Sequence, residues 1–286
     1  MAWYDKFLAF YDKPFDTVPK DVTAAIRGRV EALQSDTPPD VSVVIIAYNE
    51  ERRLAACIGS LSELRSRYRL EILGVDNNST DRTAEVYREL GVKCFTEQRK
   101  SPGFARQCGL EHARGRYHFF IDADTLYPPL YVDTMMDRLE RPGVACVGTF
   151  WSFYPDANHS RLGLWFFEAI RDTFLFIQHF KRPELCIRGM TFAFRADLAR
   201  QVPIRTDIRR GEDGSLALGL KQYGRIAFVY SRKCRVVTGY GTLSSEPLLK
   251  SLWKRIKIQG KGITRIFYSK DHYEDSPENL VKQKKP

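Results

Sequence analysis

The sequence predicts an α/β protein with a Rossmann-like, mostly parallel central sheet flanked by helices. Three observations support this prediction. Short apolar runs alternate with helical patterns between residues 41 and 121, the connections between them are short, and polar or acidic residues follow three of the runs. Such alternation is typical of right-handed strand–helix–strand units in an open sheet.

The first half of this pattern contains four predicted strands and three predicted helices. Residues 41–47 read VSVVIIA, a β-branched run bounded by polar residues, as in a buried parallel strand. Further strands are predicted at 70–75, 92–95 and 117–121. Helices are predicted at 51–67, where leucine and isoleucine recur at helical spacing, at 81–90, with Ser79 or Thr80 as the N-cap, and at 103–113.

The second half is richer in aromatic residues. Residues 150–180 hold ten of them, and 162–180 predicts a helix that is apolar nearly all round. This helix could pack in the core under the sheet, or it could lie at a membrane interface. A helix is also predicted at 211–223, and strands are predicted at 226–230 and 234–238.

The two ends of the chain differ from the part between them. Residues 1–40 are interrupted by prolines and predict an N-terminal extension with one short helix at 22–33. Residues 248–267 predict a basic amphipathic helix, followed by a polar tail. We therefore expect one main domain at 41–240, with residues 241–286 as a separate helix and tail.

The positive charge of the chain is unevenly distributed. The formal net charge is +10, yet residues 205–270 alone hold 15 Lys and Arg against 4 Asp and Glu. Such a basic region attracts an anionic partner, such as a phosphorylated substrate or an acidic membrane surface. No nucleic-acid-binding motif accompanies the charge, so nucleic acid is not expected as a partner.

Composition excludes several other classes of protein. Hydrophobic residues make up 43% of the 286 residues and charged residues 28%, which excludes general disorder. The six cysteines are scattered without metal-ligand spacing, so we expect free core thiols in a reducing compartment. We find neither a signal peptide nor a run long enough to span a membrane, and a cytoplasmic location is expected.

Polar residues at the carboxyl ends of the strands are the first candidates for a site, because ligands of open α/β sheets bind there. They are Tyr48-Asn49-Glu50, Asp76-Asn77-Asn78-Ser79 and Asp122-Ala123-Asp124. Two carboxylates separated by one residue suit a divalent cation that also binds phosphate, although a solvated turn explains the same pattern. Asp76 could accept a hydrogen bond from a ring N–H of a base, whereas Ser79 or Thr80 and Asp81 could simply cap the next helix.

Glu212-Asp213 is a further acidic pair, at the start of the helix predicted at 211–223. Carboxylates at this position usually stabilise the N-terminus of a helix. A general base within a basic region is the alternative interpretation.

Taken in order, these segments resemble glycosyltransferase family 2. The resemblance rests on VSVVIIAYNE (41–50), VDNNSTD (75–81), GFARQCG (103–109), ARGRY (113–117), FIDAD (120–124) and GED (211–213), and covers residues 41 to 237. It implies a glycosyltransferase A fold and inverting sugar transfer from a nucleotide diphosphate sugar. It also divides the main domain into a nucleotide-sugar-binding half at 41–125 and an acceptor-binding half at 126–240.

The resemblance implies a role for each candidate residue. Asp213 would be the general base, Asp124 would bind Mn²⁺ or Mg²⁺, and His272 could be a second metal ligand. The acceptor side would include Arg188, Gly189 and Glu212. The residues implied to bind the nucleotide sugar are Ala47, Tyr48, Glu50, Asp76, Asn78, Arg106, Asp122, Ala123 and Asp124.

The expected function is metal-dependent transfer of a sugar, with UDP as the expected carrier, to a hydroxyl of a glycan or lipid-linked acceptor. The Q-x-x-R-W signature of processive synthases is absent, so a single addition is expected. Peripheral association with the inner face of an anionic membrane is a further expectation. The alternative is a non-catalytic binder of nucleotide sugars or anionic surfaces with the same fold. A nucleotidyltransferase is disfavoured because no glycine-rich triphosphate loop follows the first strand.

Overall fold

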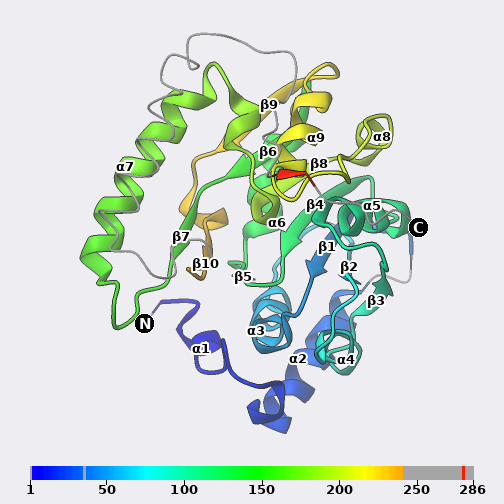
Figure 1. The fold of residues 1–286 in the computed structure, drawn as a ribbon, viewed down its shortest axis with the longest axis vertical. Coiled ribbons are helices and arrows are strands. Elements are labelled where there is room, and N and C mark those ends of the chain that lie inside the picture. The colour runs from blue at the N-terminus through cyan, green and yellow to red at the C-terminus, as the bar shows by residue number, and fades with distance from the viewer. Residues whose placement is uncertain (1, 35–36, 241–278, 281–286) are drawn as a thin grey trace.

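A computed structural model of the protein describes residues 2–34, 37–240 and 279–280. Seven strands form the central sheet in the order β3-β2-β1-β4-β8-β6-β9 (Figure 1). A small second sheet has the order β5-β10-β7. The α/β class predicted from the sequence is therefore confirmed, and the central sheet is mostly parallel.

The register of the central sheet brings the candidate segments to one edge. Ala47 pairs with Asp76, and Ile46 pairs with Asp122, all in parallel strands. The strands of this sheet are β1 (Val41–Ala47), β2 (Leu70–Asp76), β3 (Lys93–Thr96), β4 (Tyr117–Asp122), β6 (Val144–Thr149), β8 (Phe192–Arg195) and β9 (Arg225–Val229). Those of the second sheet are β5 (Thr125–Leu126), β7 (Trp151–Phe153) and β10 (Val236–Thr238).

Helices cover both faces of the central sheet because its strands alternate their side chains between two apolar clusters. Val43 and Ile45 of β1 belong to the cluster under α3 and α6, whereas Val44 belongs to the cluster under α5 and α9. The helices are α1 (Asp5–Leu8), α2 (Lys20–Leu33), α3 (Glu51–Leu61), α4 (Thr83–Glu89), α5 (Pro102–His112), α6 (Tyr131–Leu139), α7 (Arg161–His179), α8 (Ala196–Ala199) and α9 (Glu212–Leu220). Short 3₁₀ turns are η1 (Phe15–Thr17), η2 (Pro183–Cys186), η3 (Gly189–Thr191) and η4 (Arg232–Cys234).

Local sequence explains where the site-bearing helices begin. The Ser101 hydroxyl accepts a hydrogen bond from the Phe104 amide, and Pro102 occupies the first turn of α5. Gly211 precedes α9 with a φ of 93°, a left-handed conformation that glycine adopts without steric cost. Both helix starts face the carboxyl-end edge of the sheet.

The N-terminal segment packs into the core of the domain that follows it. Phe7, Tyr11 and Phe15 are buried in the same apolar cluster as Ile26 and Val30 of α2. This cluster also contains the apolar face of α3, so residues predicted as an extension help to support α3 and β1.

The predicted helix at 51–67 is too long. Helix α3 ends at Leu61 because the following chain is bound to α6 and the loop before it. The Arg65 amide donates to the Pro129 carbonyl at 2.8 Å, and the Ser66 hydroxyl donates to Asp133 at 2.7 Å. These tertiary hydrogen bonds override the helical spacing of the leucines.

The predicted N-cap of the second helix is also wrong. Helix α4 begins at Thr83, and Asp81 accepts a hydrogen bond from the Thr83 amide at 3.0 Å. Ser79 and Thr80 bind the loop after β1 instead. They therefore connect two loops of the sheet edge rather than capping a helix.

Helix α7 matches the predicted aromatic helix, but it does not lie under the sheet. Figure 1 shows it at one side of the molecule, apart from the helices that cover the central sheet. Its buried residues are Leu164, Phe167, Leu175 and Gln178. In the described ranges, no helix is both long and apolar enough to span a membrane.

Two other outcomes complete the comparison with the predictions. The six cysteines form no disulfide, and five of them are buried, as expected for core thiols. The basic helix predicted at 248–267 lies outside the described residues.

Candidate active site

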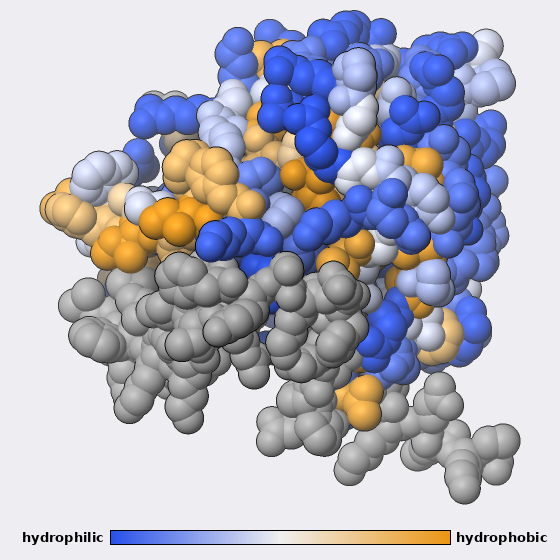
Figure 2. All heavy atoms as spheres, turned by 90° about the horizontal axis from the view of Figure 1, so that it is seen from above, coloured by the Kyte–Doolittle hydropathy of each residue, from blue (hydrophilic) through white to orange (hydrophobic). Residues whose placement is uncertain are grey.

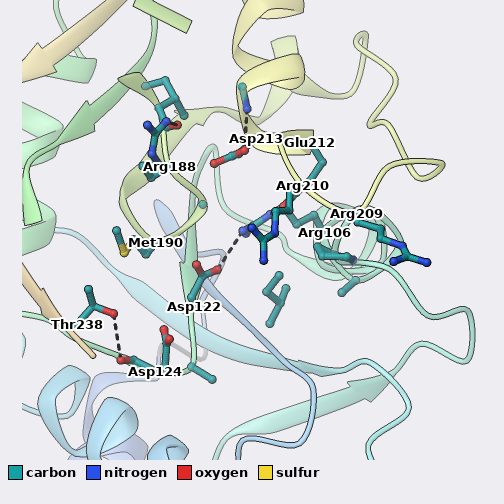
Figure 3. Close-up of a pocket in the computed structure, with 18 of the residues that line it drawn as sticks. Arg106, Asp122, Asp124, Arg188, Met190, Arg209, Arg210, Glu212, Asp213 and Thr238 are labelled. Atoms are coloured by element: carbon teal, nitrogen blue, oxygen red, sulfur yellow. Dashed lines mark hydrogen bonds and ion pairs between the residues drawn. The ribbon is translucent and has the colours of Figure 1, made fainter. Parts of the chain in front are cut away.

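A cavity of about 1030 Å³ opens at the carboxyl ends of the central strands (Figure 3). Most of the residues predicted for the site line this cavity. They are Ala47, Tyr48, Glu50, Arg106, Asp122, Ala123, Asp124, Arg188, Gly189, Glu212 and Asp213. Asp76 and Asn78 do not line it, although Asn77 between them does. His272 lies outside the described residues.

Reciprocal hydrogen bonds hold the loops after β1 and β2 together. The backbone amide of Asn49 donates to the Ser79 hydroxyl at 2.9 Å. The side-chain oxygen of Asn49 accepts from the backbone amide of Thr80 at 2.8 Å. Asn49 and Asn78 have φ values of 56° and 59°, which asparagine tolerates better than most residues. These bonds fix the loop that carries Tyr48 and Glu50 at the cavity.

The side-chain amide of Asn77 connects the loop after β2 with the chain that follows β3. It donates hydrogen bonds to the carbonyls of Glu97 and Arg99 at 3.2 and 2.8 Å. Asp76 is buried, and the Ser79 amide donates to both of its carboxylate oxygens at 3.4 Å. Because these two hydrogen bonds are long, Asp76 retains capacity to accept from a further N–H.

Three carboxylates form an acidic wall in the cavity: Glu50, Asp122 and Asp124. Burial raises the pKa of Glu50 to about 7, and the charge of Asp124 adds to this while Arg53 opposes it. Burial likewise raises the pKa of Asp122 to about 6, against the effect of Arg106. The pKa of Asp124 is also raised by burial. The protein therefore leaves part of this negative charge uncompensated.

The backbone of Asp124 is fixed by residues from distant parts of the chain. The Tyr11 hydroxyl donates to the Asp124 carbonyl at 2.7 Å, and the Thr238 hydroxyl donates to the same carbonyl at 3.4 Å. Tyr11 was not anticipated from the sequence, because no local pattern connects it with residue 124. Its position shows that the N-terminal segment shapes the acidic wall.

These residues fit a divalent cation that shares its coordination with a ligand. Mn²⁺ and Mg²⁺ prefer carboxylate oxygens and commonly complete their coordination with phosphate oxygens and water. Within the part of the chain that the structure describes, no three His, Cys, Asp or Glu side chains are grouped as a complete metal site. The acidic wall can therefore supply some of the ligands, and an anionic ligand or water would supply the others.

Arg106 connects the two sides of the cavity. Its Nη2 donates to Asp122 at 3.0 Å, and its Nε donates to Glu212 at 2.9 Å (Figure 3). The arginine side chain is only 3% exposed, and its Nη1 is buried without a hydrogen-bond partner among the residues that the structure describes. Burial raises the pKa of Glu212, the charge of Asp213 adds to the rise, and Arg106 opposes it. The structure thus shows Arg106 as a bridge between β4 and α9.

Gly189 makes room for this bridge. A Cβ atom at position 189 would lie 1.8 Å from Nη2 and 2.7 Å from Cζ of Arg106. The resemblance placed Gly189 on the acceptor side, and the structure shows that it packs closely against a buried guanidinium.

Replacing Gly189 by Ala is expected to displace Arg106 and lower the free energy of unfolding by about 1–3 kcal/mol, as overpacking does elsewhere. Urea unfolding measures this change. Gly28→Ala is the matched control, because a Cβ at position 28 of α2 meets nothing within 4 Å. Equal stabilities of the two variants would contradict a tight fit around Arg106.

Asp213 lies in the first turn of α9, next to the buried Glu212. Its Oδ1 accepts a hydrogen bond from the Gly214 amide at 2.9 Å, and no salt bridge involves Asp213 among the described residues. Oδ2 has no hydrogen-bond partner in the same ranges. This oxygen is therefore available to accept a proton from a ligand in the cavity.

The remaining wall of the cavity is aromatic and cationic. The Arg188 guanidinium donates to the carbonyls of Leu185 and Ile187 at 2.8 Å and lies 5.6 Å from the centre of the Trp151 ring. The sequence did not single out Trp151, Phe153, Phe167, Arg171 or Lys100 as lining residues. Only the aromatic enrichment near residue 150 hinted at the first three.

The family model described as Glycosyl transferase family 2 matches residues 42–202, more than half of the chain. The chain belongs to glycosyltransferase family 2. The matched region contains the acidic wall and Arg106. The resemblance stated from the sequence is confirmed.

Curated glycosyltransferases match this chain over part of their length. Glycosyltransferase GlyA of Streptococcus pneumoniae is 27% identical over 141 residues, which are 47% of this chain and 19% of GlyA. Glycosyltransferase AglE of Haloferax volcanii is 28% identical over 132 residues, 43% of each chain. This chain therefore spans less than half of the length of either relative.

Solved structures share the glycosyltransferase A fold of this family 2 chain. The mannosyltransferase PcManGT of Pyrobaculum calidifontis, in complex with GDP-Man and Mn²⁺, has a TM-score of 0.57 at 18% identity, covering 91% of this chain and 76% of its own. Glucosyl-3-phosphoglycerate synthase of Mycobacterium tuberculosis, with Mn²⁺, UDP-glucose and phosphoglyceric acid, has a TM-score of 0.51 at 21% identity, covering 85% of each chain. At these identities the likeness shows the fold.

Proposed function

We propose that this glycosyltransferase inverts the anomeric centre of a nucleotide diphosphate sugar in a single, metal-dependent transfer to an acceptor hydroxyl. The observation that carries the proposal is the placement of two kinds of carboxylate around one cavity. Asp122 and Asp124 come from the end of β4, whereas Asp213 enters from the start of α9 (Figure 3).

The acidic wall would hold the diphosphate of the donor through a divalent cation. When bound, the cation would offset the negative charge that develops on the leaving diphosphate. Asp124 is the proposed protein ligand, and Asp122, oriented by Arg106, lies beside it. Relatives in solved complexes bind GDP-Man or UDP-glucose together with Mn²⁺, which supports this part of the proposal.

Asp213 would act on the acceptor from the opposite side of the sugar. Its Oδ2 would take the proton of the acceptor hydroxyl while the acceptor oxygen bonds to the anomeric carbon and the bond from that carbon to the diphosphate breaks. Attack opposite to the leaving group inverts the anomeric configuration. Arg188, close to Trp151, lies on the wall proposed for the acceptor.

The finer details of the donor and acceptor belong to the same proposal. Asp76 would accept a hydrogen bond from the N–H of the base, as uracil in UDP provides. The acceptor would be a glycan or lipid-linked intermediate, presented at the cytoplasmic face of a membrane with which the protein associates peripherally.

Donor binding tests the metal-dependent step without knowledge of the acceptor. A panel of UDP- and GDP-sugars is expected to raise the melting temperature of the wild-type protein more in the presence of Mn²⁺ than in its absence. Asp124→Asn is expected to lose the Mn²⁺-dependent part of this rise, since it removes a charged metal ligand. Differential scanning fluorimetry measures both effects.

Asp137→Asn is the matched control, because Asp137 is a surface acid paired with Arg67 and should leave the Mn²⁺ effect unchanged. A full Mn²⁺-dependent rise in the Asp124 variant would contradict the metal assignment. Donor binding without hydrolysis or transfer to any acceptor would instead favour a non-catalytic binding protein.

A further inference from the structure

Helix α7 exposes a continuous row of large apolar side chains along its outer face. These side chains have relative exposures between 45% and 72%, and they include two adjacent pairs. We call them the α7 apolar stripe: Leu162, Trp165, Phe166, Ile170, Phe176, Ile177 and Phe180. Figure 2 shows apolar side chains gathered on the side of the molecule that α7 occupies. Exposed apolar patches of this kind mark interaction surfaces.

The acidic residues of α7 face the opposite way. Glu168 accepts a hydrogen bond from the Phe153 amide at 2.7 Å and pairs with Arg235 at 3.0 Å. Asp172 pairs with Arg171 and Arg235, both at 2.7 Å. The helix thus directs its carboxylates inward and its apolar side chains outward, so the outer face carries no negative charge.

Positive charge flanks the stripe at both ends. Arg161 is the first residue of α7, Lys181 follows its last turn, and both are exposed. Tyr240 stacks on His159 with ring centroids 4.1 Å apart, so the described range 37–240 ends beside the start of α7. An apolar stripe next to cations matches the acyl chains and head groups of an anionic bilayer.

We propose that the α7 apolar stripe inserts into the interface of an anionic lipid membrane, with the helix axis parallel to the surface. A helix of 19 residues is about 28 Å long, so the stripe offers one extended line of contact. Six of the seven side chains are hydrocarbon only and bury apolar area without a hydrogen-bonding partner, and the indole N–H of Trp165 would bond within the head-group region. Arg161 and Lys181 would contact the lipid phosphates.

This orientation places the acceptor wall directly above the membrane. Phe167 and Arg171, on the inner face of the same helix, line the cavity. A lipid-linked acceptor would then be presented on the side of the cavity that α7 lines, a consequence that rests on the proposed function. Docking of the stripe itself does not depend on catalysis.

Sedimentation of the full chain with vesicles tests the proposal. Vesicles of phosphatidylcholine and phosphatidylglycerol at 7:3 are expected to bind the protein, and pure phosphatidylcholine vesicles to bind it more weakly. The triple variant Leu162→Gln, Ile170→Gln, Ile177→Gln is expected to lower the partition coefficient at least about ten-fold, since it removes most of the apolar area of three inserted side chains. Leu130→Gln, Tyr223→Gln is the control, because both residues are exposed but distant in sequence from the stripe.

Trp165 provides a second, position-specific measurement. Lipids brominated on their acyl chains are expected to quench part of the tryptophan fluorescence of the wild type, and Trp165→Phe to remove that quenched part. Asp213→Asn is expected to retain vesicle binding, so a failure of the catalytic proposal remains separate from a failure of this one.

Three results would overturn the membrane proposal. One is the absence of wild-type binding to the 7:3 vesicles. Another is a dimer in analytical ultracentrifugation that the triple variant dissociates without any effect on vesicle binding, which would assign the stripe to contact between copies. The third is a lowered melting temperature of the triple variant with unchanged vesicle binding, which would show that the chain itself covers the stripe.

Discussion

Asp213→Asn is expected to reduce the rate of sugar transfer by about 10²–10⁴-fold, the usual contribution of a general base. The amide is nearly the same size as the carboxylate and still accepts the hydrogen bond from the Gly214 amide, but it cannot take a proton from the acceptor. Release of the nucleotide diphosphate, followed with a coupled assay, measures the loss. The affinity for the donor is expected to remain, since the proposed role of Asp213 is to act on the acceptor.

Asp207→Asn is the matched control for this result. Asp207 precedes the same helix but is bound to Arg205 at 2.7 Å, and its replacement should leave transfer unchanged. Full activity of the Asp213 variant would contradict its assignment as the base. A parallel loss of donor affinity would indicate a contact with the donor instead.

Arg106→Met is expected to lower the free energy of unfolding by about 3–5 kcal/mol, the usual effect of removing one partner of a buried ion pair. The substitution leaves Glu212 and Asp122 without their shared cation. Without Arg106, burial raises the pKa of Glu212 further above its unfolded value. Protonation of Glu212 then favours the folded state. The loss in the free energy of unfolding, relative to the wild type, should therefore shrink as the pH falls from 8 towards 5. Urea unfolding at several pH values measures it.

Two further variants sharpen this prediction. Arg106→Lys keeps the charge, but a single ammonium cannot span both carboxylates as the guanidinium does, so an intermediate loss is expected. Arg195→Met removes an exposed arginine paired with Asp197 and should leave stability nearly unchanged. If Arg106→Met lowers the free energy of unfolding by the same amount at every pH, Arg106 stabilises the fold through packing rather than through its charge.

The sheet edge and its residues were predictable because they depend on local pattern and a general rule of topology. Buried parallel strands such as β1 are short apolar runs, and their carboxyl ends meet at one edge. Asp122 and Asp124 therefore reach the cavity whatever the exact helix boundaries are. The antiparallel pairing of β8 between β4 and β6 was not predictable, because its partners lie far away in the sequence.

The contacts within the site were less accessible from the sequence. Arg106 was expected near the base or the phosphates, yet its guanidinium is held by Asp122 and Glu212, and direct contact with the nucleotide stays a prediction. Nothing in the spacing of Tyr11 and Asp124 reveals their hydrogen bond. The apolar character of α7 was evident in the sequence. Which face of the helix is exposed was not, because it depends on the inward contacts of Glu168 and Asp172.

The bridge made by Arg106 has a consequence for exchanging parts between relatives. Its guanidinium on α5 ties β4 to the helix that carries Asp213, so the two predicted halves of the domain are not independent modules. A chimaera that takes its acceptor half from another family member inherits a productive geometry only if a carboxylate at position 212 and the glycine at 189 come with it. Positions 106, 189 and 212 should therefore be exchanged as one unit when segments are recombined between relatives. Substitutions at these three positions are expected to have non-additive effects.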